Sequence, residues 1–427
     1  MPRFLHRLKI SLLDWIRFSP VVRQLAYHAK LCSRPLLSAG DKAKSERIET
    51  LCAAARLAET EEQILKVEKH IHREVPKKEA IVSSLSDPEE RHIRKVAILK
   101  PWSESTGEPG VLFISFEYEW AKLLHAENLE ELARRYHLVI SPTWTPPHSA
   151  VNCLFPHVYP GPIYCLISNR TDLDTFPRLS PEYRMIDLFA SSWVDPDLFQ
   201  PVAYEDKEID LVMLANFGVY KRHHALFRAM RELPESWRIV LIGQPNGSRT
   251  DEVLLSEAEA FGVRDRLELR QRISDEEVCR LLAQAKLSLI CSRREGSCVA
   301  VVESMFAGTP VALLKGAQIG SGYFINEETG AFVDESRLAV DLQQLHTRAQ
   351  SMHPRKWALE NRLSAEDSSQ RLNEFLAAES RSRNLPWNRD IEPMHWRPNP
   401  TLMAEAPPSW EEEEKAALLE LTGITFG

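Results

Sequence analysis

Residues 286–314 read KLSLICSRREGSCVAVVESMFAGTPVALL, and they carry the clearest indication of how this chain folds. The apolar run 286–291 is followed by polar residues and then by a helix-forming segment that extends to about Ala307. The turn at 308–310 leads into a second apolar run that begins at Val311. Short apolar runs that alternate with helical segments are typical of parallel strands joined by crossover helices. The segment therefore predicts a strand–helix–strand unit of a doubly wound α/β domain.

The same alternation extends toward the N-terminus. Ser274 and Glu277 have the spacing of a capping box, so a helix is expected over residues 275–285. Three further apolar runs precede this helix, each consistent with a strand: 209–215, 238–243 and 266–270. Together these elements predict one Rossmann-like domain over residues 203–350.

A second block of alternating strands and helices lies upstream. We expect it to form another Rossmann-like domain over residues 91–202, which ends in a linker at 193–201. The carboxyl edges of the two sheets are then expected to face a common cleft. The apolar runs that predict the strands of this block are 96–99, 111–116, 137–141, 163–168 and 186–191.

The two ends of the chain differ from these blocks. Residues 1–90 predict a helical extension, and residues 351–427 predict a helix followed by a tail rich in Trp and Pro that wraps over a domain. Residues 4–18 form a basic amphipathic helix that either packs on its own domain or lies at a membrane surface. Its apolar stripe consists of Phe4, Leu5, Leu8, Leu12, Trp15, Ile16 and Phe18.

The composition excludes several classes of protein. The 427 residues carry a formal net charge of −8, so a generic nucleic-acid binder is not expected. The 7 cysteines show no C-x-x-C spacing, which is typical of reduced thiols. No apolar window is long enough for a membrane span, and no signal peptide is recognisable. We therefore expect a cytoplasmic protein, with peripheral contact at the inner membrane face if residues 4–18 lie at a membrane and do not pack on their own domain.

The polar residues between the two strands of 286–314 point to an anion site. Glu295 follows the first strand, and Ser297 is placed to cap the next helix. The free N–H groups and the dipole of a helix N-terminus attract anions at the carboxyl edge of a parallel sheet. A diphosphate is therefore expected near Ser297, Cys298 and Val299, with Glu295 and Glu303 placed to accept sugar hydroxyls. The alternative is that both carboxylates are ordinary surface charges.

The spacing of Glu295 and Glu303 resembles the E-x7-E motif of retaining glycosyltransferases of the family-4 type, the glycosyl transferases group 1, which have the GT-B fold. The resemblance covers residues 209–345, and over 96–202 it extends only to the pattern of the fold. The other elements that fall in the order of the family are Lys221-Arg222-His223, Ile242-Gly243, residues 272–282, residues 307–310 and residues 329–333.

This resemblance implies an enzyme that moves a sugar from a nucleotide-sugar donor to a glycan, lipid or small-molecule acceptor, with retention of the anomeric configuration. It implies that Glu295 contacts hydroxyls of the donor sugar and that Glu303 binds the ribose. Lys221 or Arg222 would neutralise the leaving diphosphate. The residues implied for donor binding are Asn216, Gly243, Gly296, Ser297, Cys298, Val299 and Glu303.

A cation at the diphosphate is also reasonable on physical grounds. Negative charge grows on the diphosphate oxygen in the transition state, and a preorganised cation there lowers the barrier. Because the resembled family is typically independent of metal, we expect no metal and no other cofactor. No D-x-D pair lies near the expected donor site, since Asp195-Pro-Asp197 falls in the linker.

The chain departs from the family pattern at three places. Ala215-Asn216 stands where a Gly-Arg pair is common, and Ser297-Cys298 replaces Phe-Gly. The upstream block has no obvious Gly-rich loop after its first strand, where Gly107 and Gly110 are the only candidates. On the acceptor side, Glu117 follows a strand and His148 lies in a Pro-rich loop, so both are candidates for acceptor binding, with loop polarity or capping as the alternative.

A different class of function stays open beside the enzyme. The departures also fit a non-catalytic GT-B-like protein that serves in binding or as a scaffold. A nucleotide-sugar epimerase or a phosphorylase is a weaker alternative, because neither an acid/base pair nor a cofactor lysine is recognisable.

Overall fold

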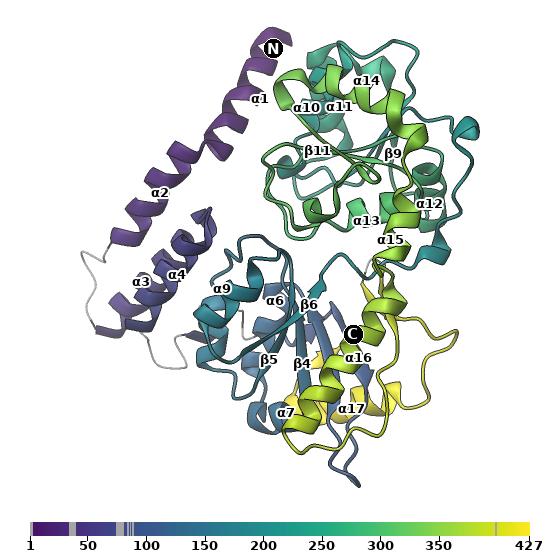
Figure 1. Cartoon of the computed structure of the whole chain (residues 1–427). Coiled ribbons are helices and arrows are strands. Elements are labelled where there is room, and N and C mark those ends of the chain that lie inside the picture. The colour runs from purple at the N-terminus through teal and green to yellow at the C-terminus, as the bar shows by residue number, and fades with distance from the viewer. Residues whose placement is uncertain are drawn as a thin grey trace. The chain divides into compact units, whose positions relative to one another are not determined.

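The computed structural model describes residues 3–33, 40–73, 81–82, 85, 87, 89–397 and 399–427. It divides into two compact units (Figure 1). Unit 1 consists of Met1–Ser19 and Val194–Ser364, and unit 2 of Pro20–Trp193 and Ala365–Gly427. These bounds differ from those expected from the sequence, because the first helix joins residues 194–364 and the C-terminal segment joins the upstream block.

Unit 1 contains a six-stranded sheet in which every pairing is parallel, as the alternating pattern predicted. Read from β9, the strands lie in the order third, second, first, fourth, fifth and sixth along the chain. Successive strands are added toward one edge of the sheet from β7 to β9 and toward the other edge from β10 to β12. The switch point of this doubly wound order lies between β7 and β10, and ligands bind at such a point. The strands are β7 (Leu211–Leu214), β8 (Ile239–Ile242), β9 (Leu267–Arg270), β10 (Ser288–Ile290), β11 (Val311–Leu314) and β12 (Gly330–Val333).

Helices cover this sheet, and two of them begin at side-chain caps. Ser274 accepts a hydrogen bond from the Glu277 amide at 3.3 Å, which confirms the expected N-cap of α12, and Thr250 caps α11 in the same way. The helices of unit 1 are α1 (Arg3–Phe18), α10 (His223–Met230), α11 (Asp251–Phe261), α12 (Asp275–Ala283), α13 (Val299–Phe306), α14 (Leu338–Arg348) and α15 (Pro354–Glu360).

Unit 2 contains a five-stranded sheet in the order β2-β3-β4-β5-β6. The strands were all expected to be parallel, and this is wrong for β2, which pairs with β3 antiparallel. The reason is that a short connection, closed by the bridge between Ser103 and Glu108, joins the two strands as a hairpin. The strands are β2 (Val96–Lys100), β3 (Gly110–Ser115), β4 (Tyr136–Ser141), β5 (Ile163–Ile167) and β6 (Tyr183–Phe189).

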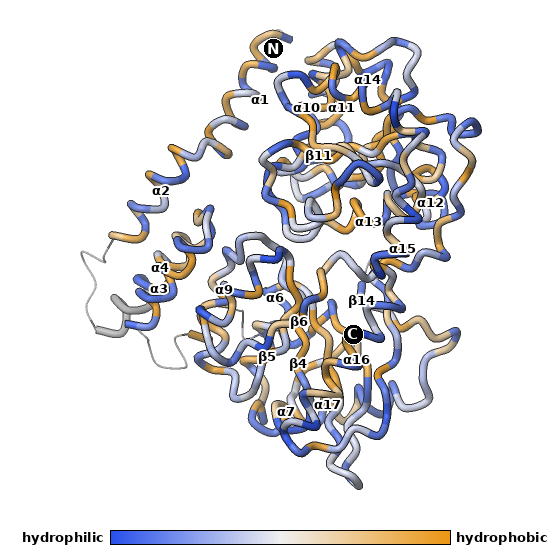
Figure 2. The backbone as a smooth tube through the Cα atoms, viewed as in Figure 1, coloured by the Kyte–Doolittle hydropathy of each residue, from blue (hydrophilic) through white to orange (hydrophobic). Residues whose placement is uncertain are grey.

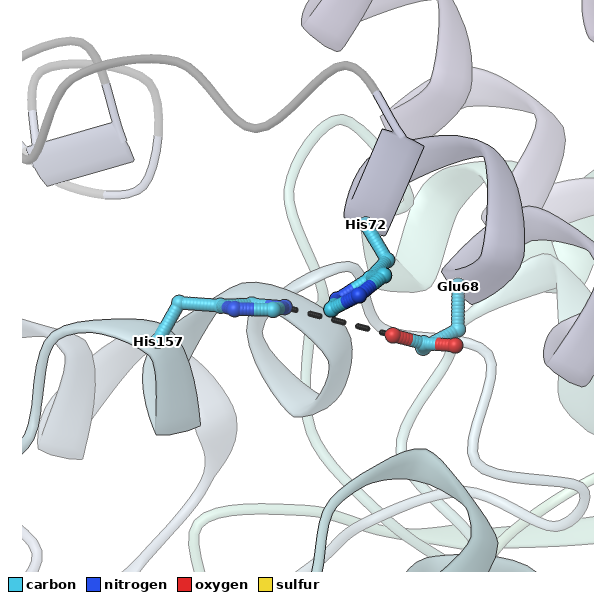
Figure 3. A group of neighbouring side chains, drawn as sticks. All are labelled: Glu68, His72 and His157. Carbon is cyan, nitrogen blue, oxygen red and sulfur yellow. Dashed lines mark ion pairs between the residues drawn. The ribbon is translucent and has the colours of Figure 1, made fainter.

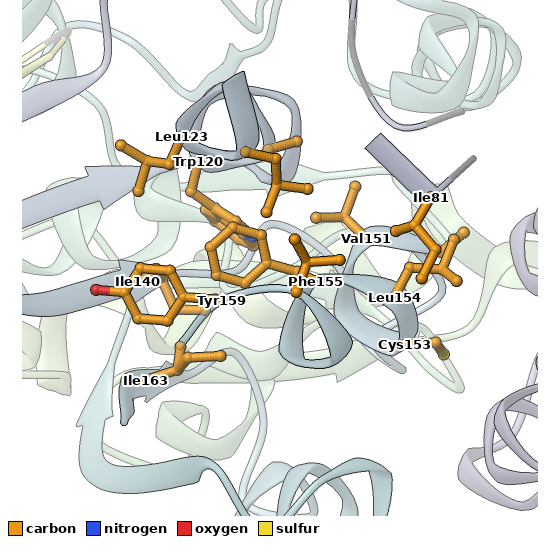
Figure 4. Close-up of a cluster of buried hydrophobic side chains, with 14 of the residues drawn as sticks. Ile81, Trp120, Leu123, Ile140, Val151, Cys153, Leu154, Phe155, Tyr159 and Ile163 are labelled. Carbon is orange, nitrogen blue, oxygen red and sulfur yellow. The ribbon is translucent and has the colours of Figure 1, made fainter. Parts of the chain in front are cut away.

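A large apolar core lies between this sheet and the helices of unit 2, with Trp120 and Phe155 fully buried near its centre (Figure 4). The C-terminal segment packs on the same unit, where the Lys100 ammonium lies 3.2 Å from the ring centroid of Trp387. The main helices are α2 (Pro20–Cys32), α3 (Gly40–Leu57), α4 (Glu61–Arg73), α6 (Glu117–Trp120), α7 (Leu129–Arg135), α8 (Val151–Leu154), α9 (Asp172–Leu179), α16 (Ala365–Ser382) and α17 (Glu411–Thr422).

Strand β11 consists of apolar residues, whereas α1 alternates between apolar and polar residues along its length (Figure 2). Within the described residues, no helix combines the length and the apolar character that crossing a bilayer requires.

Candidate functional site

The candidate site lies at the switch point of unit 1. Lys221 ends the short helix η5 (Val219–Lys221) that follows β7, and Glu295 lies in the loop that follows β10. Both residues were singled out from the sequence, and the topology brings them to the same edge of the sheet because β7 and β10 are parallel neighbours. This is the edge at which doubly wound sheets bind nucleotides.

Lys221 and Glu295 form a close ion pair. The ammonium donates to both carboxylate oxygens at 2.7 Å, and the two side chains are 14% and 11% exposed. Burial lowers the pKa of Lys221, but the neighbouring Glu295 carboxylate outweighs that effect, so the pKa lies above its usual value. Lys221 therefore remains charged, and a ligand that brings its own negative charge can compete with Glu295 for it.

The loop that carries Glu295 is fixed by a second loop, at residues 318–321. The Glu295 amide donates to the Gln318 carbonyl at 3.0 Å, and the Gly320 amide donates to the Gly296 carbonyl at 2.8 Å. The Ser321 amide donates to the Ser297 carbonyl at 3.2 Å. These contacts hold the start of α13 in one position, which a preorganised anion site requires.

Cys298 is the N-cap of α13 and adopts a left-handed backbone conformation with φ 55° and ψ 83°. This region favours glycine, and a residue with a Cβ atom is strained there. Cys298, which departs from the family pattern, thus lies at a position whose backbone conformation favours glycine. Burial raises the pKa of the Cys298 thiol, so a reactive thiolate is not expected.

The remaining donor-side candidates surround the same loop. Ser297 and Gly296 are buried, while Val299 and Glu303 are half-buried at the start and in the middle of α13. The first N–H groups of α13 have no partner within the helix, which is the general property of a helix start. The loop and helix therefore present backbone amides and one carboxylate within a few residues of the Lys221–Glu295 pair.

Asn216 and Gly243 shape the loops that follow β7 and β8. The Asn216 side chain accepts a hydrogen bond from the Gly218 amide at 3.0 Å and donates to the Tyr220 hydroxyl at 3.0 Å. A Cβ atom at Gly243 would lie 2.1 Å from the Ala215 carbonyl oxygen, so only glycine fits there. Both residues position the segment that leads to Lys221.

Arg222 was expected to act on the diphosphate, and the structure places it elsewhere. Its side chain has no exposed surface, and its guanidinium donates to Asp14 at 2.8 and 2.9 Å and to Glu335 at 2.8 and 3.0 Å. The Cys291 carbonyl accepts a further bond at 3.3 Å. With its donors committed to two carboxylates, Arg222 ties α1 and the segment after β12 to the end of β10.

The acceptor-side candidates both lie in unit 2. Glu117 begins α6 and is buried, and it accepts hydrogen bonds from the Thr143 amide at 3.2 Å and the Thr143 hydroxyl at 2.5 Å. Burial raises the pKa of Glu117 although these bonds oppose it. His148 is half-buried and meets Trp144 edge-on, with ring centroids 4.9 Å apart. Both residues follow strands at one edge of the sheet, as expected.

The carboxylates of Asp14 and Glu335 and the loop 318–321 were not predicted from the sequence as parts of the site. His223 was noted only as a member of Lys221-Arg222-His223, without a role of its own. Burial, with the charge of Arg249, lowers the pKa of His223 to about 3, so this side chain is neutral. The position of His223 directly after Lys221-Arg222 was a usable signal, whereas nothing in the local sequence connects Asp14 with Arg222.

Comparison with known families agrees with this geometry. The family model for glycosyl transferases group 1 matches residues 194–353, which contain the whole parallel sheet and the candidate site. Residues 194–353 form a glycosyl transferases group 1 domain. The match leaves residues 1–193 and 354–427 outside the glycosyltransferase domain.

Two curated relatives are similar over a limited stretch. A GDP-mannose:cellobiosyl-diphosphopolyprenol alpha-mannosyltransferase of Xanthomonas campestris is 27% identical over 135 residues, which are 30% of this chain and 35% of the relative. An MMP alpha-(1->4)-mannosyltransferase of Mycolicibacterium hassiacum is 32% identical over 127 residues, 28% of each chain. The matched stretches thus span about a third of these relatives.

Solved structures show the same fold at lower sequence identity. A sucrose-phosphate synthase of Thermosynechococcus elongatus has a TM-score of 0.52 at 17% identity, and the match covers 64% of this chain and 74% of that one. The HepE protein of Anabaena, solved in complex with UDP, has a TM-score of 0.50 at 14% identity and covers 62% and 78%. These likenesses establish an α/β fold of the GT-B type.

Proposed function

We propose that this chain is a retaining glycosyltransferase that uses a nucleotide-sugar donor and holds it on unit 1. The observation that carries the proposal is the pairing of Lys221 with Glu295 at the switch point of the sheet, beside the start of α13. The family match over residues 194–353 supports it, and so does the UDP complex of one structural neighbour.

In this proposal the diphosphate of the donor replaces Glu295 as the partner of Lys221. Glu295 is then released to accept hydrogen bonds from hydroxyls of the donor sugar. Glu303, farther along α13, accepts from the ribose hydroxyls, and the backbone at Gly296, Ser297, Cys298 and Val299 contacts the sugar and the phosphate. Apart from Lys221, which follows β7, each of these groups lies on the loop after β10 or on α13.

The bond between the anomeric carbon and the diphosphate oxygen breaks, and the acceptor oxygen bonds to the same face of the sugar. The acceptor proton passes to the diphosphate oxygen that leaves. Because negative charge accumulates on that oxygen, Lys221 and the first amides of α13 stabilise the transition state more than the ground state. Two sources of positive charge are thereby present, so the proposal needs no divalent metal at the donor.

Arg222 has a positioning role in this account. A buried guanidinium held by two carboxylates costs several kcal/mol to separate from them, so it is a poor candidate to move toward a ligand. Of the two candidate side chains, Lys221 is the one assigned to the diphosphate. Glu117 and His148 in unit 2 stay the candidates for contact with the acceptor.

We propose further that the acceptor is lipid-linked and that α1 brings the enzyme to the membrane. The name of one relative gives its acceptor as a diphosphopolyprenol, which is a lipid. In α1 the side of the helix that meets unit 1 carries Ile10, which packs on the core, and Asp14, which binds Arg222. The apolar stripe lies on the opposite side, and all of its members there are exposed: Phe4, Leu5, Leu8, Leu12, Trp15 and Ile16.

The charges around the stripe select an anionic lipid surface as its partner. Lys9 and Arg17 are exposed and basic. Asp14, the one acidic residue of α1, forms an ion pair with Arg222. An exposed apolar stripe flanked by basic residues is the pattern of a helix that lies in the membrane interface. Co-sedimentation with vesicles of phosphatidylglycerol and phosphatidylcholine, compared with phosphatidylcholine alone, tests this contact.

The double variant Leu8→Glu with Trp15→Glu is expected to lose most of the sedimentation with anionic vesicles. Leu13→Glu is the matched control, because Leu13 is also exposed and apolar but lies away from the stripe. Equal sedimentation of the Leu8→Glu/Trp15→Glu double variant and the Leu13→Glu variant would contradict the membrane contact. This result would not bear on the proposed donor site.

The transferase itself is tested by incubating the protein with nucleotide-sugars and measuring the release of nucleoside diphosphate, with and without a membrane extract as acceptor. Release that depends on Lys221 supports the proposal. A cooperatively folded protein that neither binds nor cleaves any nucleotide-sugar would favour the binding or scaffold alternative.

A further inference from the structure

Three side chains of unit 2 that could ligate a metal ion converge in one place. Glu68 and His72 lie one turn apart on α4, and His157 ends the short helix η2 (Phe155–His157) (Figure 3). One donor atom of each side chain lies within 4.8 Å of the others. The three residues come from segments more than 80 positions apart, so the cluster is a product of the tertiary fold.

The Glu68 carboxylate is poorly satisfied by its surroundings. Glu68 is 8% exposed, and within the described part of the chain its carboxylate accepts no hydrogen bond. The His157 Nε2 atom lies 4.0 Å from a Glu68 carboxylate oxygen, which is beyond hydrogen-bond distance. A buried carboxylate without a donor is costly, and a bound cation would remove that cost.

The two histidine rings lie beside each other, with centroids 5.9 Å apart and an interplanar angle of 34°. Neutral imidazole is the form that ligates metals. The cluster therefore brings two imidazole donors and one carboxylate together.

We propose that Glu68, His72 and His157 bind one divalent transition-metal ion of the zinc class. Two imidazoles and one carboxylate form a ligand set that Zn²⁺ uses, with a fourth position left to water. Ligands of tetrahedral zinc lie about 2.0–2.2 Å from the ion and hence about 3.5 Å from one another. The donors need to close by little more than about 1 Å from the present separation, which rotation of the exposed imidazoles of His72 and His157 allows.

Such an ion would join two parts of unit 2. α4 belongs to the N-terminal helical segment, and His157 follows α8 in the layer that covers the sheet. Metal binding would therefore stabilise the packing of α4 on this layer, since a ligand that binds only the folded state stabilises it by mass action. The inference is independent of the proposed transferase, whose donor residues all lie in unit 1.

The test uses the full chain after treatment with a chelator, titrated with Zn²⁺ against a chromophoric competitor. We expect one high-affinity site per chain and a higher melting temperature with Zn²⁺. His72→Asn and His157→Asn should each weaken binding at least tenfold and abolish the rise in melting temperature. His72 and His157 lie at the surface, and the His157 side chain is 23% exposed, so these variants are expected to fold.

His70→Asn is the matched control, because His70 lies on the same helix outside the cluster and should leave Zn²⁺ affinity unchanged. Co²⁺ substitution provides a second readout, since thiolate ligands produce strong near-ultraviolet absorption that a His/His/Glu site lacks. Zn²⁺ affinity that is the same in His72→Asn, His157→Asn and His70→Asn would overturn the proposal, as would a thiolate spectrum.

Discussion

The ammonium of Lys221 lies 2.7 Å from both carboxylate oxygens of Glu295, although the two residues are 74 positions apart in the chain. Each group is the charged partner of the other, so a ligand that binds either one competes with this pair. In the proposed mode of donor binding, a diphosphate replaces Glu295 as the partner of Lys221, and a sugar hydroxyl replaces Lys221 as the partner of Glu295. Four predictions follow from this arrangement and from the residues that surround it.

Replacement of Lys221 should reduce catalysis more than binding. Lys221→Ala removes the cation that stabilises the leaving diphosphate, and loss of one such group typically costs about 10²- to 10³-fold in kcat. Steady-state rates of nucleoside diphosphate release measure the effect. Lys221→Arg keeps the charge and should retain part of the activity, and a Lys221→Ala enzyme with unchanged kcat would refute the assigned role.

Replacement of Cys298 by glycine should stabilise unit 1. Cys298 has φ 55°, a conformation that costs a residue with a Cβ atom about 1 kcal/mol or more. Cys298→Gly relieves this strain, and Cys298→Ala, which keeps the Cβ atom, should not. Thermal unfolding of the two variants makes the comparison. A higher melting temperature for Cys298→Ala than for Cys298→Gly would show that the thiol and not the backbone decides stability here.

Disruption of the Arg222 cluster should affect stability and leave donor affinity nearly unchanged. Asp14→Asn removes one of the two carboxylates that hold the buried guanidinium, and breaking such a pair costs about 3 to 5 kcal/mol. Chemical denaturation measures the loss, and calorimetry measures the dissociation constant for the nucleoside diphosphate. A large loss of donor affinity in a protein that is still folded would contradict the positioning role and indicate that Arg222 contributes to ligand binding.

The same cluster predicts how stability depends on pH. Burial opposes the ionisation of Glu335, but Arg222 and its neighbours lower the pKa of this residue from 4.5 to about 2. The unfolded chain therefore takes up the proton first, and the stabilisation is complete above about pH 4.5 and is lost as the pH falls toward 2.

Glu335→Gln should flatten the decline in stability over this pH window and lower stability at neutral pH. Glu327→Gln is the control, because Glu327 is exposed and has no ion-pair partner among the described residues. Urea unfolding between pH 3 and 7 distinguishes the two variants. Identical pH profiles for Glu335→Gln and the unchanged chain would contradict the assignment.

Much of the fold was predictable because its signals are local. Strands β8 and β11 of unit 1 are short apolar runs that are buried along their length, and the cap of α12 is encoded by Ser274 and Glu277. The position of Lys221 and Glu295 at one edge also followed, since the carboxyl ends of parallel strands meet at the same side of a sheet.

The remainder depends on contacts between distant segments. Arg222 and Asp14 are 208 positions apart, so no local pattern assigns the guanidinium to α1 and away from a ligand. For the same reason the sequence did not place α1 with residues 194–364, nor Glu68 beside His157. The antiparallel pairing of β2 was missed because an apolar strand has the same composition in either direction.

We propose that unit 1 binds a nucleoside diphosphate through Lys221, Glu295 and Glu303. Calorimetric titration with UDP, GDP, ADP and dTDP in the absence of metal measures this binding. We expect that one of these ligands binds selectively, that Glu303→Gln weakens its affinity at least tenfold, and that Glu327→Gln does not. Failure of all four ligands to bind a protein that unfolds cooperatively, or equal affinity of the two variants, would contradict this proposal.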